Sequence, residues 1–299
     1  MTSLILCLLA LSVESALAGA WTLPAGKTWA KVTYFQQRAD EWYTANAEFS
    51  GRLYDAGTRR PYRFGGEYES KAVFIEGFVG ITDRLDLGAQ IPYFDQKFSD
   101  DTRLEPGADA GFSDLRLLAK FRLTEKPAIV TLKTGVKLPT GEFRNEDGLI
   151  PVGEGQSDYD FILQVGRSFW PLPIYANAEV GYRVRTKNQQ INRDPGDEWL
   201  YNAEVGYNPT DRLLLALKVE ALRGGKGTEF GFIRSASLIK RITYISPTVS
   251  YHLAGGAALE VAVRSTINGR NFPAGHQLTA GLSSGFDLVG ALRSLTRQR

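Results

Sequence analysis

Apolar and polar residues alternate along the stretch from residue 112 to residue 141. Between 112 and 123, Leu115, Leu117 and Phe121 share one parity, whereas Asp114 and Lys120 share the other. The run 128–138 alternates in the same way. A repeat of two is typical of a β-strand with one apolar and one polar face. The polar segment 124–127 between the runs has turn chemistry, so the pattern predicts an antiparallel hairpin.

Each run is about ten residues long, which exceeds the usual strand of about five or six residues. It is close to the roughly 9–11 residues of a tilted membrane-spanning strand. Pro247 is a local weakness in this pattern, because proline cannot donate to a strand ladder. The same alternation predicts twelve strands, at about 27–37, 68–81, 85–94, 112–123, 128–138, 157–169, 174–185, 198–207, 212–222, 240–253, 258–267 and 277–286.

The first twenty residues read as a secretory signal peptide. An apolar run at 4–13 is followed by small residues at 16–20, which suit cleavage, although no lysine or arginine precedes the run. The predicted mature chain starts at Gly19 or Trp21. Cys7, the only cysteine, lies inside this segment, so the mature chain is expected to contain no thiol. We therefore divide the chain into a signal peptide at 1–20, a barrel at 21–287 and a basic tail at 288–299.

The predicted connections alternate between long loops after odd-numbered strands and tight turns after even-numbered ones, which is typical of outer-membrane barrels. Alternation alone also fits a soluble or periplasmic β-sandwich. The export signal, the loop asymmetry and the aromatic residues near strand ends, such as Tyr93, Trp170 and Tyr201, favour the membrane. A bilayer offers the backbone no hydrogen bonds, so the sheet must close. The predicted fold is all-β, a transmembrane antiparallel β-barrel of about twelve strands with long extracellular loops and short periplasmic turns.

Composition agrees with this prediction. The 35 basic and 33 acidic residues nearly balance and form no basic block, so a nucleic-acid partner has no support. A mean hydropathy of −0.20 is too polar for a helical membrane protein but suits a barrel, in which alternate residues are polar. After the signal, no apolar run approaches the roughly 18 residues of a transmembrane helix.

The polar parity of the strands is expected to line a wetted lumen. Twelve strands exceed the roughly eight whose side chains fill a barrel, and fall short of the 16–18 of wide porins, so a narrow lumen is expected. Opposite charges facing each other across it would orient a polar solute; alternatively, they pair with each other and plug the barrel. The predicted lining is Lys31, Glu76, Asp86, Gln90, Asp114, Arg116, Lys120, Arg122, Lys133, Lys137, Asp158, Asp160, Glu179, Arg183, Arg185, Glu204, Lys218, Glu220 and Arg264.

Several short motifs carry a family resemblance. They are GFSD at 111–114, KFRL at 120–123, GVKLPTG at 135–141, GEGQSD at 153–158 and the turn GITDRLDLG at 80–88. With them the chain resembles the outer-membrane barrels named for the meta-pathway of phenol degradation. The resemblance implies an outer-membrane transporter for aromatic or other small hydrophobic compounds, and it supplies no established site. One departure is that the chain continues about thirteen residues past Phe286, whereas many such barrels end on an aromatic residue.

Three functions are compatible with the sequence. The first is a channel or passive transporter, with outer-membrane lipid and a small solute as its partners. The second is a structural or adhesive barrel with a plugged lumen, in which the aromatic loop 38–66 grips a partner or folds inward. The third is a lipid hydrolase, which needs a serine and a histidine near the outer leaflet.

The sequence argues against the hydrolase. His276 has no serine at the expected spacing, and His252, with Ser250 nearby, falls at the periplasmic end. We therefore predict that the protein is not an enzyme. No cofactor is expected, because the glycines at 153–155 and 224–227 lack the helix of a phosphate loop. Asp194 and Asp197 are interpreted as a turn rather than a metal site.

Overall fold

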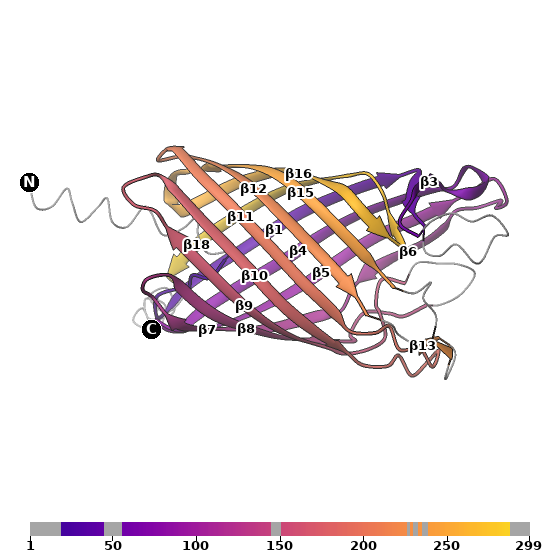
Figure 1. Cartoon of the computed structure of the whole chain (residues 1–299), viewed down its shortest axis with the longest axis horizontal. Helices are drawn as coiled ribbons and strands as arrows, with labels where there is room; N and C mark the ends of the chain where they lie inside the picture. Colours follow the sequence, from indigo (N-terminus) through magenta and orange to yellow (C-terminus); the bar gives the residue numbers. More distant parts are fainter. Residues whose placement is uncertain are drawn as a thin grey trace, which may run out of the picture.

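The computed structural model describes residues 19–44, 56–144, 151–225, 228–229, 233–234 and 239–287. Residues 1–18 of the predicted signal peptide and the predicted basic tail lie outside them. The described residues form twelve long antiparallel strand positions around a barrel (Figure 1). The strands are β1 (Lys27–Ala39), β4 (Glu67–Thr82), β5 (Leu85–Ser99), β7 (Leu115–Thr124) with β6 (Gly107–Phe112), β8 (Ile129–Leu138), β9 (Asp158–Ser168), β10 (Ile174–Arg185), β11 (Glu198–Thr210), β12 (Leu213–Gly224), β15 (Arg241–His252), β16 (Ala257–Arg270) and β18 (His276–Asp287).

The barrel closes through the first strand. β1 pairs antiparallel with β4 on one side and with β18 on the other, so that Val32 lies opposite both Ile75 and Leu282. Closure gives the terminal strands partners for their backbone groups, as a bilayer requires. The predicted twelve-stranded antiparallel barrel is confirmed, with most strands extended by a few residues beyond their predicted ends.

The predicted strand 112–123 was wrong in one respect, because it is interrupted. β6 and β7 both pair with β5, and the chain leaves the ladder between them at Ser113 and Asp114. The amide of Ser113 donates to the carbonyl of Pro92, 2.8 Å away. The Asp114 carboxylate accepts hydrogen bonds from the amides of Gly141 and Glu154, both at 3.1 Å. The strand breaks because Asp114 binds the backbone of the following loop.

The apolar parity faces outward. Val32, Ile75 and Leu87 are each 48% exposed, whereas Asp86 and Lys120, on the polar parity, are 1% and 3% exposed. This distribution inverts that of a water-soluble protein and matches a wall whose outer face contacts acyl chains. Among the described residues, no helix has the length and apolar content needed to cross a bilayer.

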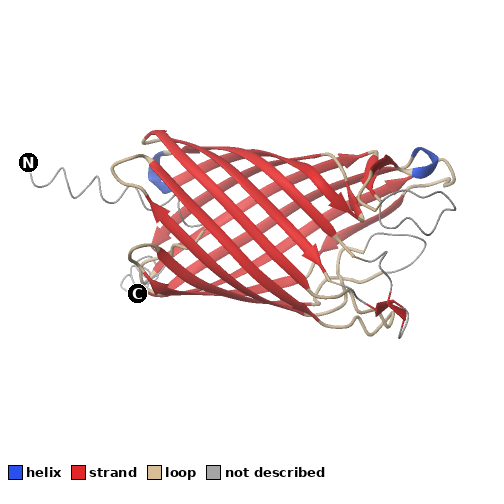
Figure 2. Ribbon diagram, viewed as in Figure 1, coloured by secondary structure: helices blue, strands red, loops and turns tan. Residues whose placement is uncertain are grey.

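The two ends of the barrel differ (Figure 2). Tight turns connect the strands at the periplasmic end. The extracellular end carries longer loops and a small sheet of β17 (Phe272–Pro273), β2 (Glu41–Tyr43) and β3 (Arg59–Pro61). A 3-10 turn, η2 (Arg63–Gly65), follows β3, and a second 3-10 turn, η4 (Ala254–Gly256), joins β15 to β16. The short strand β13 (Thr228–Glu229) pairs with β14 (Ile233–Arg234).

Pro247 does not end its strand. It lies opposite Leu217 on β12, but the pairing of β15 with β16 skips residues 246 and 247 and resumes at Thr248 and Ala262. The interruption on one side is what a residue without an N–H group produces.

Candidate functional site

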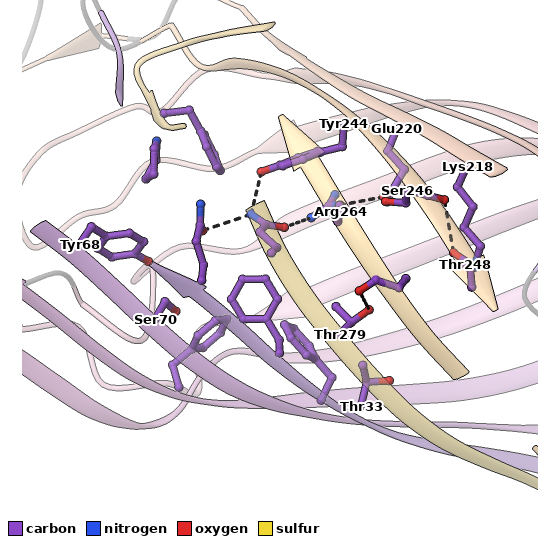
Figure 3. A pocket seen from close by; sticks show the side chains of 18 of the residues that line it. Thr33, Tyr68, Ser70, Lys218, Glu220, Tyr244, Ser246, Thr248, Arg264 and Thr279 are labelled. Atoms are coloured by element: carbon purple, nitrogen blue, oxygen red, sulfur yellow. Dashed lines mark hydrogen bonds and ion pairs between the residues drawn. The ribbon is translucent and has the colours of Figure 1, made fainter. Parts of the chain in front are cut away.

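The barrel encloses a cavity of about 970 Å³ (Figure 3). One wall, from β1, β4 and β5, is aromatic. The ring of Phe74 makes edge-to-face contacts with Phe35, at 6.3 Å between centroids, and with Phe94, at 5.7 Å. Above them Tyr62, from the loop after β3, contacts Phe98 at 5.5 Å. All five rings line the cavity and give this wall an aromatic surface.

The facing wall, from β12, β15, β16 and β18, is charged and polar. Arg264 lies at its centre. Its Nε donates to Glu220 at 2.8 Å, and its Nη1 donates to the side chain of Gln277 at 3.0 Å. The guanidinium carbon also lies 3.6 Å from the ring centroid of Tyr244. Three neighbours therefore hold the guanidinium in one orientation, which a flexible surface arginine would not have.

A second charged group lies deeper in the cavity. The ammonium of Lys218 is 3.4 Å from Glu204 and 4.0 Å from Glu260, and Lys31 reaches Glu260 at 2.8 Å. The hydroxyl of Tyr175 donates to Glu204. Positively and negatively charged side chains alternate along this wall. Their polar groups can therefore form hydrogen bonds to a solute in place of those to each other.

The extracellular ends of β7 to β11 carry an ion-pair cluster, defined as Asp114, Arg116, Lys137, Glu154, Asp158, Asp160, Arg183, Arg185 and Glu198. Lys137 lies 3.3 Å from Asp114 and 2.9 Å from Asp158. Arg183 donates to Asp160, with Nε 2.6 Å from one oxygen. These opposite charges pair with each other along the wall, which is one of the two arrangements expected from the sequence, and do not face one another across open space.

The predicted lining residues thus divide into groups. Glu204, Lys218, Glu220 and Arg264 line the cavity. Seven belong to the ion-pair cluster. Arg122 pairs with Glu125 at a periplasmic turn. Gln90 bonds Glu76, and Gln164 bonds Glu179. Asp86 and Lys120 bind the backbone of residues 19–23, while Lys133 lies opposite Lys120 in the β7–β8 ladder.

The lining predicted from the sequence contains only charged residues and one glutamine and does not include the aromatic wall. Phe35, Phe74 and Phe94 occupy the polar parity of their strands. Their parity was a usable signal, because a side chain's face is set by its position in the period of two. Two alternatives were open for the aromatic loop 38–66, gripping a partner or folding inward. In its described part Tyr43 packs on Ile242 and Tyr244 and Tyr62 lines the cavity, whereas Phe64 is 63% exposed. Phe49 and Tyr54 lie outside the described residues.

The structure brings together a serine and a histidine that lie eleven residues apart in the sequence. Ser265 Oγ lies 2.8 Å from His276 Nδ1, across the β16–β18 ladder at the extracellular end. The pair is on the outer parity, between the exposed Val263 and Ile267. In the described part of the chain, no carboxylate or amide hydrogen-bonds the second ring nitrogen, so the orienting partner of a catalytic triad is missing.

The remaining candidate motifs are turns. Asp194 accepts a hydrogen bond from the amide of Gly196, and Asp197 accepts from Tyr182 and from the amide of Arg185. Within the ranges that the structure describes, no group of three metal-ligating side chains is found.

Comparison with known proteins agrees with the fold. The family described as "Putative MetA-pathway of phenol degradation" matches residues 57–281. The chain belongs to this family. Among solved structures it is similar to an outer-membrane channel from Pseudomonas putida F1, with 18% identity and a TM-score of 0.73 over 89% of this chain and 98% of that one. This likeness supports the barrel fold.

More distant likenesses were also found. A KdgM porin has 7% identity and a TM-score of 0.46, covering 86% of this chain and 99% of that one. The monoaromatic hydrocarbon channel CymD has 9% identity and a TM-score of 0.44, covering 89% of each chain. No curated protein matches the chain.

Proposed function

We propose that this family member is an outer-membrane channel that passes small amphipathic solutes, of the size of a single substituted aromatic ring, by passive transport. The observation that carries the proposal is that one cavity is lined both by the aromatic wall around Phe74 and by the charged wall around Arg264. A lumen built only for water and ions would not need the aromatic surface.

The cavity matches such a solute in size and chemistry. Its volume of about 970 Å³ is within the range of roughly 300–1,000 Å³ typical of small-molecule sites. Aromatic side chains favour edge-to-face or offset contact with another ring. Arg264 and Lys218 are positioned to donate hydrogen bonds to a hydroxyl or carboxylate at the other side of that ring. Weak contacts between the solute and both walls suit conduction, because a solute that enters the lumen must also be released from it.

The alternative is a structural barrel with a closed lumen. The ion-pair cluster favours it, because paired side chains occupy the extracellular end on the β7–β11 side. Transport itself separates the two functions.

The test is uptake into proteoliposomes of radiolabelled benzoate, which carries a charge and crosses lipid slowly, with glucose as a polar comparison. We expect faster benzoate uptake than in protein-free liposomes, and a loss of that preference in Phe74→Ala. Phe161→Ala is the matched control, because Phe161 is 53% exposed on the outer face. Uptake equal to that of empty liposomes for both solutes would favour the structural barrel.

A further inference from the structure

Residues 19–26 enter the periplasmic end of the barrel and bind its inner wall. The Lys120 ammonium donates to the carbonyl of Gly19 at 2.7 Å and to that of Trp21 at 2.6 Å. Between them, the Ala20 amide donates to Asn177 Oδ1 at 3.1 Å. Thr131 donates to the carbonyl of Ala20. The wall strands β7, β8 and β10 therefore each supply one side chain, and together these side chains bind three consecutive peptide units.

The next residues bind β5 and β4. The amide of Leu23 donates to both carboxylate oxygens of Asp86, at 3.1 and 3.2 Å. Its side chain packs in a buried cluster with Trp29 and Phe78. The ring of Trp21 meets Tyr175 edge to face, with centroids 5.9 Å apart. The segment is thus held by apolar contacts as well as by hydrogen bonds.

The wall is hollowed where the segment lies. A Cβ on Gly166 would come within 2.9 Å of the Trp21 ring, and one on Gly80 within 2.3 Å of the Pro24 carbonyl oxygen. Asp86 and Lys120 are almost fully buried charges, and buried charges require bonded partners. The structure supplies those partners from the main chain of this segment.

We propose that residues 19–26, defined as the N-terminal plug, are a resident part of the mature protein that narrows the periplasmic mouth of the lumen and gates it by partial release. The placement follows from contacts with β4, β5, β7, β8 and β10 and from Asn177, which both binds Ala20 and lines the cavity. The gating consequence rests on the proposed channel function.

The same contacts distinguish between the two predicted N-termini of the mature chain, Gly19 and Trp21. A chain that begins at Trp21 would lack the Gly19 carbonyl bound by Lys120 and both backbone groups of Ala20. We therefore assign signal cleavage to the bond between residues 18 and 19. The intact mass of the protein purified from outer membranes is expected to correspond to a Gly19 start, and a Trp21 start would overturn the assignment.

Docking is tested with a disulfide. An ideal Cβ on Gly166 lies 3.1 Å from Ala20 Cβ, near the Cβ separation of about 3.5–4.5 Å in disulfides, and 2.9 Å from the outer edge of the Trp21 ring, so the bond requires a small shift of both neighbours. Because the mature chain is expected to contain no thiol, Ala20→Cys with Gly166→Cys introduces the sole pair. We expect a crosslinked product after mild oxidation in detergent. Absence of the crosslink, with both thiols reactive to maleimide, would show that the plug is not docked.

Gating is tested by single-channel current in planar bilayers. Lys120→Met removes the anchor, and we expect the open fraction to rise by roughly tenfold or more, since a charge-assisted hydrogen bond is lost at each carbonyl. Lys133→Met removes the same charge from the neighbouring position of the ladder. Within the described chain Lys133 makes no hydrogen bond to the plug, so this variant should gate like the wild type.

The crosslinked protein should remain in the low-current state until reductant is added. Equal currents before and after reduction, or equal open fractions in the two lysine variants, would overturn the gate. A third outcome separates the two proposals. If the crosslink forms but the wild type, Lys120→Met and the reduced protein all fail to conduct, the proposed channel function is wrong and the docked position of the plug is still supported.

Discussion

The ammonium of Lys137 lies 2.9 Å from the carboxylate of Asp158, with the two side chains only 3% and 1% exposed. Asp114 and Glu154 complete the surroundings of this lysine. Glu154 belongs to the loop that follows β8, and Asp114 binds the amide of Glu154. Lys137 therefore fastens an extracellular loop to the inner wall of the barrel.

Replacing Lys137 by methionine is expected to destabilise the barrel by about 3–5 kcal/mol, because Asp114 would be left as a buried anion without its cation and Asp158 would keep only Arg185, at 3.4 Å. Urea unfolding of the protein in lipid vesicles measures the change. The matched control is Lys27→Met, whose ion pair with Asp287 is half exposed on both sides and is expected to contribute no more than about 1 kcal/mol. Equal losses in the two variants would contradict this assignment.

Gly206 leaves room for the ring of Tyr175, since a Cβ there would lie 2.1 Å from it. Gly206→Ala is expected to displace that ring and to lower the free energy of unfolding by about 1–3 kcal/mol. Gly111→Ala is the comparison, because its Cβ would meet Val152 at an ordinary 3.6 Å. The same urea titration measures both variants. An unchanged free energy of unfolding in Gly206→Ala would show that the close packing of Tyr175 does not contribute to stability.

Glu154 makes stability depend on pH in acid. Burial alone would raise the pKa of this carboxyl, but Arg185, Lys137 and Lys240 outweigh it and hold the pKa well below its usual range. A carboxyl with a depressed pKa stabilises the folded state fully above its unfolded pKa of about 4.3, and this contribution is lost as the pH falls toward the folded value.

The wild type should therefore exceed Glu154→Gln in stability by a constant amount between about pH 8 and pH 5. The difference should shrink as the pH falls further. Unfolding midpoints of both proteins across this range measure it, with Glu142→Gln as the control. Glu142 bonds Arg144 in an exposed pair of the same loop. A difference that grows in acid would reverse the sign of the proposed linkage.

The contact between Ser265 and His276 is expected to be catalytically silent. The second ring nitrogen has no orienting partner among the described residues, so the imidazole is not fixed as a base. Hydrolysis of a detergent-dispersed nitrophenyl ester should equal the rate of a Ser265→Ala variant. A rate that falls in both Ser265→Ala and His276→Ala would restore the hydrolase hypothesis.

Much of the architecture follows from the sequence alone. The parity of Leu117 and Lys120 predicted one outward and one inward side chain, and in the structure Leu117 is 43% exposed whereas Lys120 is 3% exposed. The long and short connections predicted the two ends. The break at Ser113 and Asp114 was not predictable in this way, because it depends on Gly141 and Glu154, which reach Asp114 from a later loop.

By itself, the sequence determined the closed barrel and the face of each strand residue, because both follow from a local property, the period of two, together with the backbone's need for hydrogen bonds in lipid. Only the tertiary structure decided which inward side chains meet. Phe35 and Phe94 join through Phe74, and Lys120 binds Gly19 about a hundred residues away, because strand tilt and closure set which positions share a level inside the barrel. No spacing along the chain contains that information.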